Sequence, residues 1–127
     1  MICTHQTAVD IPNVIQINEL ISGQFTNDEI SVALEKTAGG TGDESFKSAA
    51  FDEWLCVLKG RIMCKIMGQD NDVEVGPGET VFIEKDSKWK PWFPEDAEFI
   101  AICKPAFRPE RIKIIVAELP VGATTTL

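Results

Sequence analysis

Short apolar runs separated by turn residues dominate the chain, and its middle part has no long segment with a sustained helical repeat. This pattern is typical of strands, which are short and recur with turns at regular spacing in sandwiches and barrels. The sequence therefore predicts an all-β fold. The expected strands are residues 13–17, 30–36, 53–58, 62–67, 73–75, 80–83, 88–93 and 98–103.

Lys59-Gly60 stands between two of these runs and has the composition of a tight turn. A two-residue hairpin there would pair Cys56 with Met63, so that Cys56 and Cys64 would lie in neighbouring positions of adjacent strands. We expect this hairpin.

The two ends of the chain carry weaker signals. Residues 25–28 predict a short helical turn with a polar cap. Residues 108–119 mix isoleucine with charge, which fits a strand or a short helix, and both alternatives remain open. Residues 122–127 predict a frayed end.

Two runs, 54–58 and 99–103, have almost no polar alternation. A strand that is apolar on both sides must be covered on both sides, by the interior of a barrel on one and by a second sheet or a partner chain on the other. We therefore expect a homodimer.

The length of 127 residues fits one domain with one core. Twelve basic against twenty acidic residues give 12 − 20 = −8, a charge that disfavours nucleic acid and anionic membranes as partners. The first ten residues lack the features of a signal peptide, and no apolar stretch is long enough to span a membrane, so a cytoplasmic protein is expected. The four cysteines form no CxxC pair, which argues against a zinc ribbon or a redox dithiol.

Two segments match the spacing of a known pair of motifs. The first is Gly40-x5-Phe46-x-Ser48-x4-Glu53-x6-Gly60, and the second is Gly78-x5-Glu84-x-Asp86-x2-Trp89-x3-Phe93. This spacing resembles the two-motif core of the cupin superfamily, which implies a jelly-roll barrel, the double-stranded β-helix. The resemblance spans residues 40–107, with an N-terminal arm (1–29) and a C-terminal extension (108–127) in a single domain 1–127.

Within that superfamily, residues 51–60, 77–87 and 97–105 are similar to the branch typified by the ethanolamine-utilisation protein EutQ. Three positions depart from the branch pattern: Phe51 stands where it has tyrosine, Glu84 where it has proline, and Glu98 where it has arginine. A role of the tyrosine hydroxyl or of the arginine charge is therefore not expected here.

The resemblance also implies a metal held by three histidines and a glutamate. The corresponding positions here are Phe46, Ser48 and Trp89, with Glu53 alone retained, and the only histidine, His5, lies outside both motifs. Because a first-row metal needs several converging donors, we expect no metal and no cofactor.

Glu53 is then a carboxylate at the start of an apolar strand, aimed into a barrel. Burial disfavours its charge, so it needs a cationic partner or acts as a general acid or base. The candidate partners are Lys47, Arg61, Lys88 and Lys90. On the strand 88–93, Trp89 and Phe93 should face inward, where they would either fill the core or bind an organic ligand.

We therefore expect a metal-independent, EutQ-like cupin that binds a small organic ligand, including an anionic one, in its barrel. Two alternatives remain open: a metal-free lyase, isomerase or transferase with Glu53 as the catalytic acid or base, and a non-catalytic scaffold. The predicted ligand-binding residues are Phe46, Lys47, Ser48, Glu53, Cys64, Trp89, Phe93 and Cys103.

Overall fold

The computed structural model describes residues 2–116 and confirms the all-β fold. In this part of the chain the helical segments are two 3-10 turns of three residues each, Gly23–Phe25 and Pro109–Arg111. Residues 2–116 therefore contain no helix long and apolar enough to cross a membrane. The predicted frayed end, 122–127, lies outside the described residues.

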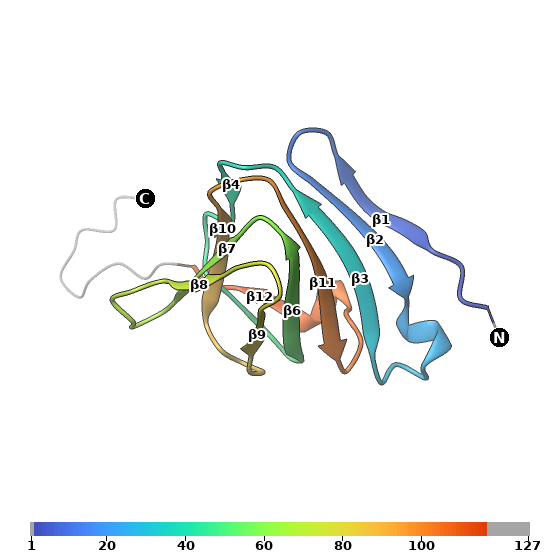
Figure 1. Cartoon of the computed structure of the whole chain (residues 1–127). Helices are drawn as coiled ribbons and strands as arrows, with labels where there is room; N and C mark the ends of the chain where they lie inside the picture. Colours follow the sequence, from blue (N-terminus) through green and yellow to red (C-terminus); the bar gives the residue numbers. More distant parts are fainter. Residues whose placement is uncertain (1, 117–127) are drawn as a thin grey trace, which may run out of the picture.

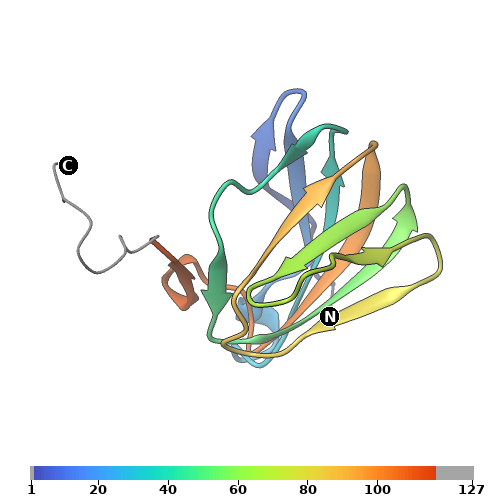
Figure 2. The same ribbon diagram turned by 90° about the vertical axis from the view of Figure 1, so that its left-hand side faces the viewer.

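Two antiparallel sheets make up the molecule, as Figures 1 and 2 show from two directions. The larger sheet contains, in spatial order, β1 (Gln6–Ile11), β2 (Ile15–Ile21), β3 (Ser31–Thr37), β11 (Ala97–Lys104), β6 (Asp52–Lys59) and β9 (Thr80–Ile83). The smaller sheet contains β12 (Ile112–Ile114), β5 (Lys47–Ala49), β10 (Trp89–Phe93), β7 (Ile62–Ile66) and β8 (Val73–Val75), with β4 (Thr41–Gly42) paired to β10.

Most predicted strands are confirmed to within two residues, and β8 and β9 have the predicted bounds. The N-terminal arm differs, because β1 was not expected and β2 extends to Ile21. At the C-terminal end both alternatives occur in succession, since the 3-10 turn Pro109–Arg111 leads directly into β12.

The predicted hairpin at Lys59-Gly60 is wrong. β6 pairs with β11 and β9 in the larger sheet, whereas β7 pairs with β10 and β8 in the smaller one. The turn therefore carries the chain from one sheet to the other. Gly60 has φ = 72°, and a Cβ at this position would collide with the backbone oxygen of Asp96, so the crossing requires glycine. Cys56 and Cys64 lie in different sheets.

The core lies between the sheets, where every second residue of strands such as β10 and β11 is buried. On β11 the inward residues Phe99, Ala101 and Cys103 are at most 5% exposed. Phe93 of β10 stacks on Phe99 with ring centroids 5.9 Å apart, which joins the two sheets.

The outer face of the larger sheet is also apolar. Ile102 of β11 lies opposite Trp54 of β6, which lies opposite Phe82 of β9. The rings of Trp54 and Phe82 are 5.1 Å apart, yet Phe82 is 50% exposed in the single chain. The two-sided apolar character expected from the sequence is therefore present, and the homodimer stays a prediction.

Candidate functional site

A cavity of about 270 Å³ lies between the sheets at the end where β3 and β11 carry small inward side chains. Cross-strand pairing places Ser31 opposite Cys103 and Ala33 opposite Ala101 on this inner surface. These side chains are too short to reach the facing sheet, so space remains between them. We call this space the barrel cavity.

The wall of the barrel cavity is mostly apolar and aromatic. Its larger side chains come from β2, β10, the segment before β6 and the C-terminal part of the chain. They are Ile15, Ile17, Phe51, Trp89, Phe107 and Ile112. A deeper space of about 80 Å³ continues towards the core and shares several of these residues, with Phe93 and Phe99 at its far end.

Charged side chains converge at the junction of the barrel cavity and the deeper space. Glu35 of β3, Lys47 of β5 and Glu53 of β6 line both. The Cys103 thiol donates a weak hydrogen bond to Glu53 Oε2, with the sulfur 3.6 Å from the oxygen. No hydrogen bond or ion pair within residues 2–116 engages the Glu35 carboxylate.

Lys47 is tied to the wall by two contacts. Its Nζ lies 3.2 Å from Asp43 Oδ2 and 5.0 Å from the centroid of the Trp89 ring. Burial works to lower the Lys47 pKa, but Asp43 and the two cavity glutamates outweigh it and leave that pKa raised. Lys47 is therefore a cation whose charge is already shared with Asp43.

Two of the cavity carboxyls, those of Glu35 and Glu53, are harder to ionise than ordinary ones. Burial, reinforced by repulsion from Glu53, raises the pKa of Glu35 from 4.5 to about 7, although Lys47 acts in the opposite direction. Burial likewise raises the pKa of Glu53, against the attraction of Lys47 and the Cys103 hydrogen bond. Near neutral pH, Glu35 is therefore poised between its acid and base forms.

The two inward thiols stay protonated. Burial and the nearby Glu53 raise the pKa of Cys64 to about 12, and the same causes raise that of Cys103 further. A thiolate is the form that attacks electrophiles and binds metals, and the raised pKa values disfavour that form in both cysteines.

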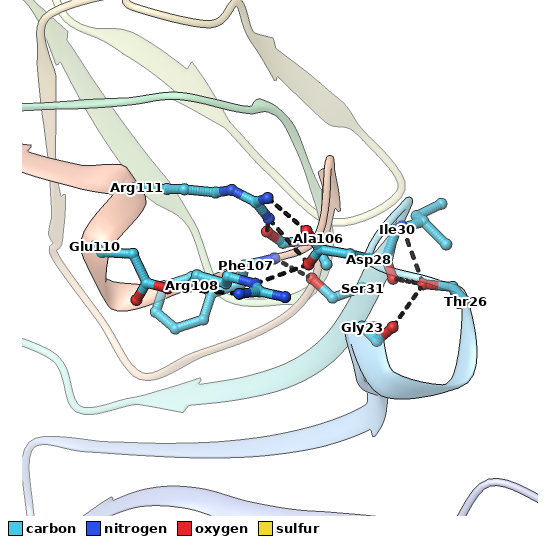
Figure 3. A network of polar contacts seen from close by, with 10 residues as sticks. All are labelled: Gly23, Thr26, Asp28, Ile30, Ser31, Ala106, Phe107, Arg108, Glu110 and Arg111. Carbon is cyan, nitrogen blue, oxygen red and sulfur yellow. Dashed lines mark hydrogen bonds and ion pairs between the residues drawn. The ribbon is translucent and has the colours of Figure 1, made fainter.

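A polar network holds the C-terminal wall of the barrel cavity in place (Figure 3). Asp28, between β2 and β3, accepts hydrogen bonds from Arg108 Nε at 2.9 Å and from Arg111 at 2.5 and 3.1 Å. The Phe107 amide donates to Ser31 Oγ at 2.7 Å. These contacts fix the segment that carries Phe107 and Ile112 into the cavity wall.

Comparison of the sequence with protein-family models and with curated proteins finds no match. Solved structures do resemble this one. The putative ethanolamine utilization protein EutQ of Salmonella typhimurium matches with a TM-score of 0.63 at 20% identity, over 76% of this chain and 73% of that chain. A cupin-like protein of Thermotoga maritima matches with a TM-score of 0.66 at 13% identity, over 80% and 75%. The protein has a cupin fold. Streptomyces PAC13, solved with uridine, matches with a TM-score of 0.69 at 10% identity, over 87% and 85%.

The cupin barrel brings together part of the predicted site. Lys47, Glu53, Trp89 and Cys103 line the barrel cavity, and Phe93 lines the deeper space. The other three predicted residues, Phe46, Ser48 and Cys64, line neither.

Each of those three has another place in the cupin barrel. Ser48 alternates with the inward Lys47 on β5 and lies opposite Lys113 of β12. The Phe46 ring packs under Lys90, whose Nζ is 4.9 Å from the ring centroid. Cys64 is fully buried in the core on β7.

Among the candidate partners of Glu53, Lys47 is the one that lines the same space. Arg61 is committed elsewhere, with Nη1 at 2.6 Å from Glu74 and Nε at 2.9 Å from Glu95. Lys90 donates to the backbone oxygen of Glu44 at 3.2 Å.

Glu35 is a cavity-lining carboxylate that the sequence analysis missed. On β3 it shares its phase with Ser31 and Ala33, while the apolar Leu34 points to the outer face, opposite Ile100. Polar residues normally mark the solvent side of a strand, so the alternation of this strand by itself does not indicate an inward glutamate. The apolar pattern of the neighbouring strand 99–103, which already demanded two covered faces, was the available clue.

The residues at the cupin metal positions do not fit a metal ion. Within residues 2–116 no three His, Cys, Asp or Glu side chains converge as a metal site requires. Glu53 faces a lysine and a protonated thiol, and Trp89 fills the place of an imidazole in the motif. The exposed His5 precedes β1 and does not line the cavity.

Proposed function

We propose that this cupin binds a small organic molecule in the barrel cavity, through contacts with side chains and without a metal ion. The observation that carries the proposal is an apolar hollow with buried, convergent polar groups at one end. Ligand sites in proteins have this construction, with volumes from roughly 300 Å³ upward. A cavity of about 270 Å³ joined to a deeper space of about 80 Å³ suits a ligand at the small end of that range.

The residues suggest how such a ligand would lie. Its apolar part would pack against Trp89 and Phe51, and its polar part would point towards Glu35 and Glu53. Streptomyces PAC13, a protein of similar fold, has been solved with uridine as a histidine-to-glutamine variant, which supports an organic ligand as an occupant of this architecture. The hollow argues against a pure scaffold, whose barrel needs no internal space.

A second candidate function is metal-free acid–base catalysis of the lyase, isomerase or transferase type. It is favoured by Glu35, whose pKa of about 7 suits proton transfer near neutral pH, beside a second carboxyl with a raised pKa. The predicted catalytic residue, Glu53, would then act together with Glu35. Deuterium incorporation into small carbonyl compounds in D₂O with a chelator present would reveal it, and Glu35→Gln and Glu53→Gln should each abolish the exchange.

We propose further that the homodimer forms through the apolar outer face of the larger sheet, where Trp54 and Phe82 lie. Light scattering of the native chain should give twice the monomer mass at micromolar concentration. Phe82→Lys should shift the distribution to monomers, and a native chain that is monomeric at that concentration would contradict the proposal.

The binding proposal is tested with a matched pair of variants. Ala101→Leu extends a side chain into the barrel cavity, whereas Ala50→Leu makes the same change at an exposed position after β5. A fragment library screened by ligand-observed NMR should yield binders to the native chain and to Ala50→Leu, and these binders should be lost in Ala101→Leu. Binders that are retained by Ala101→Leu would place the ligand elsewhere and reject the proposal.

A further inference from the structure

Acidic side chains outnumber basic ones around the barrel cavity. Glu35 and Glu53 face the space from the larger sheet, and the one cation that faces them, Lys47, is held 3.2 Å from a third carboxylate, Asp43. With all four groups ionised, the cluster would carry two net negative charges. The side chain of Asp43 is 44% exposed, so part of this excess is solvated, but the two glutamates inside the cavity still favour the uptake of a proton or a cation.

The aromatic lining of the cavity also favours a cation. The face of an indole or benzene ring attracts cations, and Trp89 already receives the Lys47 ammonium on its ring at 5.0 Å. Phe51, which is 3% exposed, lines the same space and pairs with Phe107 at a centroid distance of 6.1 Å. Carboxylates at one end and aromatic rings along the wall together suit an organic cation.

An anion would meet the opposite situation. It would have to approach two carboxyl groups, and the lysine that could attract it is already paired with Asp43. Lys88 and Lys90, which the sequence also suggested as partners of Glu53, line neither space, and Lys90 is engaged with the Glu44 backbone oxygen and the Phe46 ring. The anionic ligand that the lysines suggested in the sequence is therefore disfavoured.

We propose that the barrel cavity takes a small alkyl- or arylammonium ion, with its nitrogen between the Glu35 and Glu53 carboxylates and its apolar part against Trp89. This inference rests on the proposed function, and it adds the chemical class of the ligand. Binding would replace the proton on Glu35 by the ligand cation, so that one proton leaves the protein for each ammonium bound. No bond to carbon forms or breaks.

The affinity should depend on pH through the Glu35 proton. Below a pH of about 7 this carboxyl is protonated and the ammonium must displace the proton, so affinity falls as the pH is lowered. The titratable groups that face Glu35 come from β2, β5, β6, β11 and the segment before β5. They are Glu19, Lys47, Glu53, Cys103 and Asp43.

Three probes of nearly the same shape test the inference: benzylammonium, benzyl alcohol and benzoate, titrated by calorimetry at pH 7.5. Benzylammonium should bind at least about tenfold more tightly than the other two, because only it pairs with the carboxylates. Glu35→Gln and Glu53→Gln should each weaken its binding by about tenfold, since the isosteric amide removes the charge and keeps the shape. Repeating the titration at pH 6 in two buffers of different ionisation enthalpy should show proton release in the native chain and none in Glu35→Gln.

Glu98→Gln is the matched control. Glu98 lies on the outer face of β11 in the same sheet, between Lys36 and Lys59. Its substitution by glutamine should therefore leave benzylammonium binding unchanged. If benzyl alcohol or benzoate binds as tightly as benzylammonium or more tightly, and this binding is lost in Ala101→Leu, the ligand class proposed here is wrong. The proposed function, binding of an organic molecule in the cavity, would then still hold. Absence of benzylammonium binding, or binding unaffected by Glu35→Gln, would also overturn the ligand class.

Discussion

The two halves of the barrel are built on the same strands but differ in how their interiors are filled. In one half, Phe99 of β11 and Phe93 of β10 stack across the interior, and the space beside them is only about 80 Å³. In the other half, the same strand β11 carries Ala101 and Cys103, and the barrel cavity opens over them. Backbone pairing is continuous through both halves, so the size of alternate side chains decides where the interior is solid and where it is hollow.

Glu35 lies at the boundary of these halves, opposite Phe99 in the sheet and at the inner end of the cavity. A carboxyl there costs stability when it ionises, which a sequence selected for stability alone would avoid. The contrast suggests that the hollow half is kept for a ligand. The following measurements test whether the two halves differ in packing and in charge.

The largest difference should come from removing an aromatic ring in each half. Phe99→Ala should lower the free energy of unfolding by about 3–5 kcal/mol, because it leaves a void in close-packed surroundings. Phe107→Ala, at a ring that is 41% exposed on the cavity wall, should lower it by less than about 1 kcal/mol. Urea denaturation of both variants measures the difference, and equal losses would show that the two halves are equally packed.

Enlarging an alanine in each half should give the next largest effect. Ala97→Leu adds bulk where the chain crosses beside Gly60, and should cost about 1–3 kcal/mol through overpacking. Ala101→Leu places the same bulk in the cavity and should cost less than about 1 kcal/mol. Thermal unfolding compares the two, and a larger loss in Ala101→Leu would mean that the hollow is not available to side chains.

The free energy of unfolding should change with pH as Glu35 titrates. Its pKa is raised from 4.5 to about 7 in the folded chain, so the native state binds more protons than the unfolded state between these values. This contribution to stability is fully present below pH 4.5 and is lost as the pH rises through about 7. Glu35→Gln should flatten the profile in this window, and an unchanged slope would contradict the assignment.

The smallest effect should come from weakening the Asp28 network that holds the cavity wall in place. Asp28→Asn removes the charge that Arg108 and Arg111 share, and those hydrogen bonds hold the Asp28 pKa below its ordinary value. We expect faster hydrogen exchange at the Phe107 amide, with little change at amides of the filled half such as that of Phe99. Unchanged exchange at Phe107 would show that backbone contacts alone hold the wall.

Much of the fold was predictable because the turns are marked by glycine, proline and acidic residues, as at the boundaries of β8 and β9. The hairpin at Lys59-Gly60 was not, because the same local turn composition serves both a hairpin and a crossing between sheets. In the site, Glu53 and Trp89 followed from motif spacing, and Lys47 followed from the need of Glu53 for a nearby cationic partner. Glu35 did not, because its orientation is set by the apolar outer face and not by its own strand.

The cavity wall has a further consequence, since part of its lining comes from outside the motif region 40–107. Ile15, Ile17 and the carboxylate of Glu35 precede that region and Ile112 follows it, whereas Lys47, Glu53 and most of the aromatic wall lie within it. Two chains that share the motif region can therefore still differ in the residues that line the cavity, and motif similarity alone does not predict a shared ligand.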